Sequence, residues 1–254
     1  MARRIALAVG VLVAASLGGL LTVRAQSAAS APGAAASKPR AHELRPRIRA
    51  RVEHRQPGTL VARVRPGRIV AVRSSPGGPV VERLSSRTEF GSPRTFAITR
   101  ESPGRGYAVI TTELPNGRTG WIDAGRGALR LSRARVTLDV DLSTRLLRVH
   151  SGGRVVRTMS VGTGAPATPT PTGRFAITDE LRGADYSAAY GCCILALSGH
   201  QPNLPGGWTG GNRLAIHGGS TAGAISAGCL HASTADLAFL MRSVPLGALV
   251  VIHP

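Results

Sequence analysis

Along residues 59–134, short apolar runs alternate with clusters of turn-forming residues. Six runs rich in Val, Ile and Leu, beginning with LVARV and ending with GWIDAG, are separated by Pro-Gly, Pro-Gly-Gly, Gly-Ser-Pro and Pro-Asn-Gly sequences. Such clusters mark turns between strands, and none of the runs has the length and period of a helix. The pattern predicts a small all-β module over residues 59–134.

From residue 135 onward the strand pattern restarts. VTLDVDL alternates apolar and polar positions, which indicates a strand with one buried face, and LLRVH, VVRTMSVGTG, GRFAIT and finally ALVVIH predict further strands. One helix is predicted after residue 233, because STAD at residues 233–236 fits a capping pattern and LAFLM supplies an apolar face. Residues 181–212 are glycine-rich and predict a long irregular segment forming a lid or pocket wall, with YGCCILAL as its one apolar run.

The first 58 residues have the features of an export signal followed by a linker that does not fold. Residues 1–25 resemble a signal peptide, with Arg3-Arg4 before 19 uncharged residues (5–23) and Val23-Arg24-Ala25 as a small-x-small cleavage site. The uncharged run is also long enough for a membrane anchor, and the sequence leaves both readings open. Residues 26–58 are rich in Ala, Pro and Arg and predict a disordered linker. We therefore expect the protein in the periplasm or cell wall.

The net charge of +19 is concentrated in the first half of the chain. Residues 1–134 carry 23 basic and 7 acidic side chains, whereas residues 135–254 carry 9 and 6. A basic region attracts polyanions of any kind. Because the export signal argues against nucleic acid as a partner, we expect anionic wall polymers or lipid headgroups instead.

The residues that indicate chemistry lie in IHGGSTAGAISAGCLHAS. His217 lies twelve residues before Cys229, and a thiol nucleophile needs such a base to take its proton. Gly228 lets the backbone approach a substrate closely, so the N–H groups of Gly228 and Cys229 are candidates for an oxyanion hole. The His217 ring also needs an acceptor to fix its tautomer, and the carbonyl of Gly218 or Gly219 could supply it.

The other cysteines predict no chemistry. A bond between neighbouring cysteines is strained and rare, so we expect Cys192 and Cys193 to be small buried side chains. Together with His200, His217, Cys229 and His231 they could bind metal, but their spacing matches no zinc pattern. We therefore expect neither a metal nor a cofactor.

Residues 135–254 resemble the L,D-transpeptidase catalytic domain, also called the YkuD domain. The resemblance rests on VDLSTRLLRVHSGGRVV, VGTGAPATPTPTGRFAI, LAIHGG, SAGCL and LGALVVI, in that order. It implies an L,D-transpeptidase-type β-sandwich with one short helix after the nucleophile. A looser resemblance links VAVRSSPGGPVV and YAVITTELPNGRTGWID to SH3-like wall-associated domains, which implies that residues 59–134 bind the wall or brace the next domain.

The resemblance implies a two-step acyl transfer on peptidoglycan stem peptides. Cys229 would attack a tetrapeptide stem, releasing the terminal D-Ala and forming a thioester, which an amine of a neighbouring stem would then take over. His217 would lower the pKa of the thiol by pairing with it. Carbapenems, which family members often accept as substrate mimics, would form an adduct at Cys229.

Three departures from the family pattern concern substrate handling. Ala227 stands where the family usually has a second histidine, His231 stands where it usually has Arg or Asn, and the gap between His217 and Cys229 is shorter than usual. Ser226, His231 and Tyr190 are the candidate substrate contacts, although each could instead serve only the loop, the surface or the packing. As a contact, His231 would carry charge only near or below pH ~6.5, unlike Arg.

Two other functions fit the same residues. One is an exported wall-binding protein without catalysis, in which the basic β module does the binding. The other is a thiol peptidase acting on peptidoglycan stems, since water could replace the acceptor amine. The residues Trp208 and His200 carry no predicted role.

Overall fold

The computed structural model describes residues 58–123, 125 and 127–254. The expected export signal and nearly all of the expected linker lie outside these residues. Among the described residues, no helix combines the length and the apolar character that crossing a membrane requires. The described residues fall within one compact unit, so contacts between its two halves are part of the structure.

The β module consists of one antiparallel sheet in the order β3-β2-β6-β5-β4-β1-β7. Its strands are β1 (Thr59–Val64), β2 (Ile69–Arg73), β3 (Val80–Ser85), β4 (Thr95–Ser102), β5 (Gly106–Ile110), β6 (Gly120–Ile122) and β7 (Leu129–Ala134). Each of the six predicted runs contains a strand. The pattern does not predict β7, because this edge strand is exposed at Arg130, Leu131, Ser132 and Arg133 and shows no apolar alternation.

The C-terminal domain, residues 135–254, is built on an eight-stranded sheet in the order β10-β9-β8-β17-β12-β13-β14-β16. Its strands are β8 (Val136–Asp141), β9 (Leu146–Ser151), β10 (Arg154–Ser160), β12 (Gly173–Arg182), β13 (Cys193–His200), β14 (Arg213–Gly218), β16 (Leu230–Ala232) and β17 (Leu249–His253). A short parallel pair, β11 (Thr163–Gly164) and β15 (Ala224–Ser226), lies beside it. The pairs β17–β8 and β14–β16 are also parallel.

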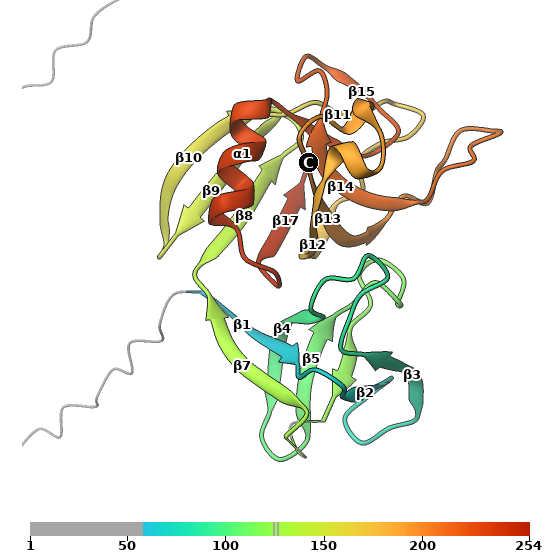
Figure 1. Ribbon diagram of the computed structural model, residues 1–254, viewed down its shortest axis with the longest axis vertical. Helices are drawn as coiled ribbons and strands as arrows, with labels where there is room; N and C mark the ends of the chain where they lie inside the picture. The colour runs from blue at the N-terminus through green and yellow to red at the C-terminus, as the bar shows by residue number, and fades with distance from the viewer. Residues whose placement is uncertain (1–57, 124, 126) are drawn as a thin grey trace, which may run out of the picture. The chain divides into compact units, whose positions relative to one another are not determined.

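One core joins both ends of this sheet. Leu147 and Val149 of β9 belong to the same buried cluster as Leu214 of β14, so the sheet bends into a nearly closed sandwich around that core. The helix α1 (Thr234–Ser243) packs its buried Leu237 and Leu240 into the cluster (Figure 1). The expected mainly-β fold with one helix after the nucleophile segment is confirmed for this domain.

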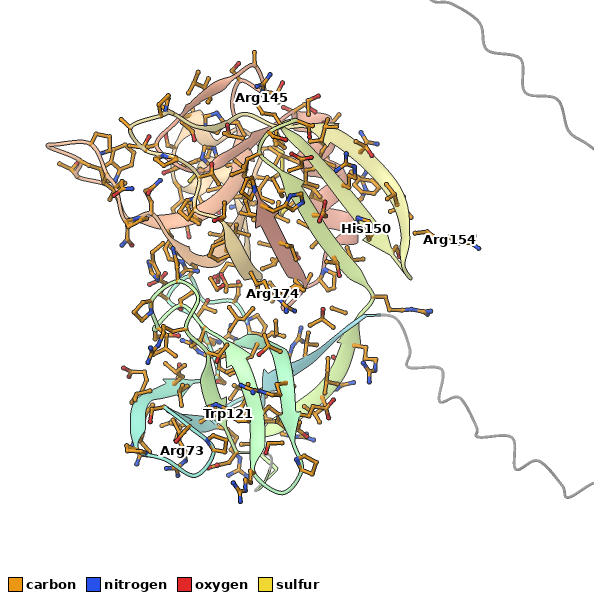
Figure 2. The ribbon with its side chains drawn as sticks, turned by 180° about the vertical axis from the view of Figure 1, so that it is seen from behind. Arg73, Trp121, Arg145, His150, Arg154 and Arg174 are labelled. Atoms are coloured by element: carbon orange, nitrogen blue, oxygen red, sulfur yellow. A yellow bond between two sulfur atoms is a disulfide. The ribbon has the colours of Figure 1, made fainter. Side chains whose placement is uncertain are left out.

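Local signals explain the ends of several elements. The Ser233 side chain accepts a hydrogen bond from Asp236 N–H at 3.2 Å and caps α1 as its sequence predicts. Gly152 and Gly153 both have positive φ, as a two-residue hairpin turn between β9 and β10 requires. Figure 2 shows Arg154 extending away from the sheet beside this turn, at the start of β10.

The expectation of an irregular segment at residues 181–212 is wrong over its middle. β13 occupies Cys193–His200 and pairs with β12 on one side and β14 on the other. Two short 3-10 turns, Gly183–Asp185 and Ala188–Tyr190, precede it. The glycines conceal this central strand in the sequence, because Gly199 is there to make room for the ring of Phe175, not to form a turn.

The β module and the C-terminal domain share apolar and polar contacts. Val61 of β1 belongs to the core cluster of the C-terminal domain, and Ala97 packs with Ala176. The Asn116 side chain pairs with the backbone of His200 through both of its polar ends, at 2.7 and 2.9 Å. His200, to which the sequence assigned no role, therefore anchors the module.

Candidate active site

A cavity of about 860 Å³ opens along β14 and contains both residues of the expected thiol chemistry, Cys229 and His217. Its wall is mainly apolar and aromatic, which favours a bound organic ligand over a bare ion. The apolar and aromatic residues of the wall include Phe90, Leu181, Tyr186, Tyr190, Ile194, Leu204, Trp208 and Ile225.

His217 is held in one tautomer by its neighbour. The ring lies near the end of β14 and is buried, with 8% of its surface exposed. Its Nδ1 atom is 2.8 Å from the Gly218 carbonyl oxygen, which can only accept, so Nδ1 carries the proton. Nε2 is therefore the basic nitrogen. The sequence left Gly218 and Gly219 open for this role, and the structure selects Gly218.

Burial keeps His217 neutral. Removal from water lowers the pKa of His217 to about 4, and the nearby His231 adds to this effect, while the bond to Gly218 opposes it. Tyr190 packs its ring edge-on against the imidazole, with centroids 4.8 Å apart. The imidazole at neutral pH is thus a free base in a dry setting.

Cys229 is the free cysteine of the described residues. Its thiol is directed at the carbonyl oxygen of Arg213, at 3.8 Å. Burial raises the pKa of Cys229, although a backbone contact to Ala215 opposes the change. In the structure the buried thiol faces a neutral acceptor, and the expected pairing with His217, which would lower this pKa, stays a prediction.

The nucleophile loop, residues 226–229, is stabilised from within. The Ser226 hydroxyl donates to the Cys229 carbonyl oxygen at 2.6 Å and accepts from the Gly228 N–H at 3.0 Å. Its single proton is thus used inside the loop, and the expectation that Ser226 contacts substrate stays a prediction. The Gly228 N–H already donates to Ser226 Oγ, so it can donate to an oxyanion only after this hydrogen bond breaks.

Gln201 supports the same loop, and no pattern in the sequence indicated this role. This side chain is 3% exposed, and its amide nitrogen donates to the carbonyls of Thr168, Pro169 and Ala227 at 3.0–3.2 Å. Gly228, at φ +115°, lies so close that a Cβ there would come within 2.0 Å of the amide. A lone glutamine in a glycine-rich stretch shows no pattern that marks it as functional.

His231 lies beside His217 because β16 runs parallel to β14 in register. The two histidines are directly paired across the strands, with ring centroids 4.8 Å apart. The ring covers Gly219, and within the described residues its Nδ1 atom has no hydrogen-bond partner. Burial lowers the pKa of His231, against a raising backbone contact to Ser220. His231 therefore faces the cavity as a neutral ring at neutral pH.

The segment that carries Tyr190 crosses closely over β14. A Cβ at Gly218 would come within 2.9 Å of both Gly191 Cα and the Tyr190 carbonyl oxygen, so only glycine fits there. Directly after this crossing, Cys192 and Cys193 form a disulfide. The expectation that they are small buried side chains is wrong, since Cys192 is exposed and Cys193 half-buried. The described residues contain no group of three or more metal-ligating side chains.

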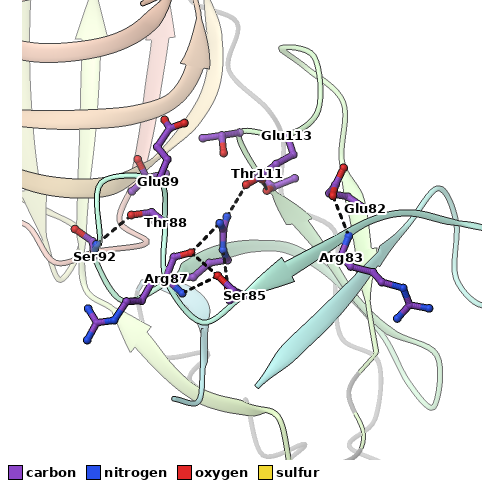
Figure 3. A network of polar contacts seen from close by, with 12 residues as sticks. Glu82, Arg83, Ser85, Arg87, Thr88, Glu89, Ser92, Thr111 and Glu113 are labelled. Atoms are coloured by element: carbon purple, nitrogen blue, oxygen red, sulfur yellow. Dashed lines mark hydrogen bonds and ion pairs between the residues drawn. The ribbon is translucent and has the colours of Figure 1, made fainter. Parts of the chain in front are cut away.

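The β module contributes to the wall of the cavity through the seam loop, residues 86–93. Phe90 lines the cavity and packs edge-on against Tyr186, with centroids 6.0 Å apart. Glu89 pairs with the guanidinium of Arg213, and the Thr88 hydroxyl donates to the buried Asp179. Figure 3 shows this loop, where the Ser92 N–H donates to Thr88 Oγ1 at 3.1 Å.

Arg213 links this seam loop to the nucleophile. Its side chain also donates to Thr178 Oγ1 and the Leu197 carbonyl, at 2.7 and 2.8 Å, while its own carbonyl faces the Cys229 thiol. Burial lowers the pKa of Arg213, against the raising effect of Glu89 and Asp179. The sequence missed this link because Glu89 lies 124 residues before Arg213 in the chain.

Comparisons with known proteins address the fold and the family. Several solved structures are similar at low identity. Bd1075 of Bdellovibrio bacteriovorus is 18% identical with a TM-score of 0.38, over 47% of this chain and 48% of that one. The chain thus spans about half of the Bdellovibrio protein's length. Structural similarity at this level says nothing about activity.

Two mycobacterial structures are similar to the same degree. An L,D-transpeptidase from Mycobacterium smegmatis is 16% identical over 63% of this chain and 82% of that one, with a TM-score of 0.38. L,D-transpeptidase 3 of Mycobacterium tuberculosis, solved with a faropenem-derived adduct, is 17% identical over 54% and 73%, with a TM-score of 0.36.

The family comparison is specific to the C-terminal domain. No curated protein is similar enough in sequence to count as a relative. The resemblance of residues 59–134 to SH3-like domains is not addressed by these comparisons and stays a prediction. Residues 135–252 match the family model of the YkuD domain, the L,D-transpeptidase catalytic domain.

Proposed function

We propose that this protein is an exported cell-wall L,D-transpeptidase with Cys229 as its nucleophile and His217 as its base. The observation that carries the proposal is that both side chains open into one apolar cavity of a YkuD domain. Apart from the bonded pair Cys192–Cys193, Cys229 is also the thiol that the described residues offer for such chemistry. The donor is the tetrapeptide stem of peptidoglycan.

The first step transfers the stem to the enzyme. Cys229 Sγ attacks the carbonyl carbon of the third stem residue while His217 Nε2 takes the thiol proton. The amide bond to the terminal D-Ala then breaks, and the protonated His217 returns the proton to the leaving amine. A thioester at Cys229 and free D-Ala result.

The second step transfers the acyl group from Cys229 to an acceptor amine. An amine of a neighbouring stem attacks the thioester and forms a new amide bond. His217 Nε2 takes a proton from this amine, and the thiolate of Cys229 leaves and recovers the proton. No net oxidation or other reactant is needed in either step.

The resting protonation states decide how the attack is activated. The pKa of His217 is lowered to about 4 and that of Cys229 is raised, so both groups are neutral at pH 7. A preformed thiolate–imidazolium pair is then absent, and His217 acts as a general base during the attack itself. The thiol must turn from the Arg213 carbonyl towards Nε2 when substrate arrives, which couples activation to binding.

The backbone of the nucleophile loop stabilises the oxyanion. Within the described residues, no hydrogen bond is found for the Cys229 N–H, so this donor is available. The Gly228 N–H becomes a second donor if the oxyanion replaces Ser226 Oγ as its acceptor. Each donor of this kind is worth roughly 3–4 kcal/mol of transition-state stabilisation.

Tyr190 and His231 frame the substrate on either side of His217. Tyr190 fixes the imidazole by its edge-on contact, and it presents a phenol to the cavity. The unpaired Nδ1 of His231 offers a donor or acceptor to a polar group of the stem. The apolar remainder of the wall excludes water, which protects the thioester from hydrolysis.

The test uses the full chain with a tetrapeptide donor and follows D-Ala release and the mass of the protein. Wild type and the Cys192→Ser/Cys193→Ser variant should release D-Ala and gain a mass adduct with a carbapenem, whereas Cys229→Ser should do neither. Release of D-Ala without any cross-linked product, even with excess amine, would identify a thiol peptidase instead. Turnover by Cys229→Ser would refute the proposed nucleophile.

A further inference from the structure

Four arginines line one groove of the β module, at positions far from His217 and Cys229 in the sequence. The groove has a volume of about 300 Å³, and Arg63, Arg65, Arg87 and Arg130 line it. No carboxylate and no aromatic side chain is among its lining residues. We call this feature the arginine groove.

The strand register places these charges against each other. Arg63 of β1 is directly opposite Arg130 of β7. Arg65 follows just after the end of β1 and lines the same groove. Like charges directly opposite on a sheet are destabilising. A bound anion would remove this repulsion, whereas the described protein offers no counter-charge of its own.

Neutral groups orient the guanidiniums without neutralising them. Arg63 Nε donates to Thr95 Oγ1 at 3.4 Å, Arg65 Nε to the Leu129 carbonyl at 3.3 Å, and Arg87 Nη1 to the Gly91 carbonyl at 2.6 Å. Each guanidinium has five N–H donors, so most of them stay available. These neutral acceptors thus orient the guanidinium groups and leave their positive charge without a counter-charge.

Several other arginines of the described residues are neutralised by a carboxylate. Arg73, Arg94, Arg157 and Arg213 each pair with a carboxylate, at Asp123, Glu113, Asp236 and Glu89 respectively. None of the four groove arginines forms an ion pair within the described residues. Arginines without an ion pair also lie elsewhere on the described surface, but the groove brings four of them into one hollow.

We propose that the arginine groove binds a phosphodiester polymer through its phosphate groups. Arginine forks match phosphate oxygens in bidentate geometry, and several forks in one groove can take successive phosphates of a chain. Nucleic acid is a poor fit, because a binder of single strands stacks bases on aromatic side chains, and the groove has none. The ligand class is thus a polymer with a phosphodiester backbone and no bases.

This binding site is separate from the acyl-transfer site. All of its lining residues belong to the β module, and none of them lines the cavity that holds Cys229. It would hold the enzyme on a polyanionic surface while the C-terminal domain acts. The inference therefore stands even if the proposed function fails.

The experiment measures binding of the full chain to a synthetic poly(glycerol phosphate) oligomer by calorimetry. At about 100 mM salt the Debye length is about 10 Å, so remote charges contribute little. The Arg63→Gln/Arg130→Gln variant should bind about 10-fold more weakly or worse, because two charged hydrogen-bonding contacts are lost. The control Arg83→Gln/Arg105→Gln removes the same charge from exposed positions outside the groove and should change the Kd less than about 2-fold.

Several outcomes would overturn the inference. Equal loss of affinity in both variants would mean a diffuse charge effect, and equal competition by polyglutamate would mean no preference for phosphate. Tighter binding of a single-stranded DNA oligomer would mean that bases are recognised. In the supporting case inorganic phosphate competes weakly, and D-Ala release by both variants equals that of wild type. Circular dichroism melting confirms that both variants are folded.

Discussion

The β module and the C-terminal domain are both built from β-sheets, but they place their polar side chains in opposite ways. Residues 59–134 carry 13 arginines against five carboxylates, and the groove arginines remain exposed and without ion pairs. The C-terminal domain instead buries Gln201, His217 and Ser226 and gives each a specific hydrogen-bond partner. The same fold class thus serves two kinds of polar chemistry.

Burial explains why this difference matters. A buried polar group that lacks its partner costs roughly 1–3 kcal/mol, so each buried bond fixes the geometry around Cys229. An exposed arginine retains its hydration and contributes little to stability, but it keeps its charge free for a ligand. The comparison predicts that substitutions in the domain change stability and turnover together, whereas those in the module change binding alone.

The largest effect is expected at Gln201. Gln201→Leu removes the donor that three backbone carbonyls share and should lower the free energy of unfolding by about 3 kcal/mol. It should also slow acylation by a carbapenem, because Ala227 and the nucleophile loop lose their support. Urea denaturation and the rate of adduct formation by mass spectrometry measure both.

Asn203→Ala is the matched control for Gln201→Leu. The Asn203 side chain is exposed and forms no hydrogen bond within the described residues, so stability should change by less than about 0.5 kcal/mol. If Gln201→Leu were as harmless as this control, buried hydrogen bonding would not be what distinguishes the domain from the module.

The second effect is a loss of stability on mild acidification. The unfolded state binds a proton at His217 with a pKa near 6.5, whereas burial lowers the folded-state pKa to about 4. Stability is therefore lost as the pH falls from about 6.5 towards 4, by about 2 kcal/mol between pH 7 and pH 5. The lowered pKa of His231 adds to the loss in the same direction.

Urea denaturation at pH 7 and pH 5 measures this slope. His217→Gln keeps a polar side chain without the titration, and it should reduce the difference between the two pH values by most of its amount. An unchanged difference would mean that His217 is accessible to water in the folded state, which contradicts its burial.

The sequence predicted those parts of the site that depend on local signals. Turn clusters and apolar alternation mark most of the strands, and the cap at Ser233 marks the helix. The identity of the nucleophile segment follows from His217 and Cys229, which the fold does bring into one cavity. Each of these signals acts within a few residues of the chain or rests on residue types that the chemistry itself requires.

The remaining parts depend on contacts between distant segments. Gln201 supports the nucleophile loop because the fold places it beside Gly228 and three backbone carbonyls. Phe90 reaches the cavity from a module that the sequence pattern shows as a separate unit. The direction of the Cys229 thiol depends on the carbonyl of Arg213, not on its neighbours in the sequence. Residue type and spacing do not encode these tertiary partners.

The third effect concerns the nucleophile loop itself. Ser226→Ala removes the bonds to the Cys229 carbonyl and from the Gly228 N–H, and it should cost about 1–2 kcal/mol of stability. Because the loop geometry changes, the fold decrease in the acylation rate should be larger than the fold increase in the Kd for substrate. Ser220→Ala, at an exposed serine that bonds only Ala222 N–H, should change the unfolding free energy by less than about 0.5 kcal/mol.

The smallest effect is expected where the two regions meet, at Glu89. The Glu89 carboxylate is 58% exposed, so its pair with Arg213 contributes no more than about 1 kcal/mol to stability after solvent screening. Glu89→Gln should therefore leave the melting temperature nearly unchanged. Its influence on the site is positional, because Arg213 holds the β14 segment whose carbonyl the Cys229 thiol faces. We expect a KM for the donor stem that is a few-fold higher at low salt, with a smaller change in kcat.

A salt series separates this role from a merely structural one. Wild-type KM should rise with salt as the exposed pair is screened, and the Glu89→Gln variant should lose that dependence. Glu82→Gln, an exposed carboxylate on β3 without an ion pair within the described residues, serves as the control and should retain the wild-type salt response. If Glu89→Gln and Glu82→Gln respond alike, the seam loop closes the cavity only through Phe90, and the charge on the module serves binding at the arginine groove alone.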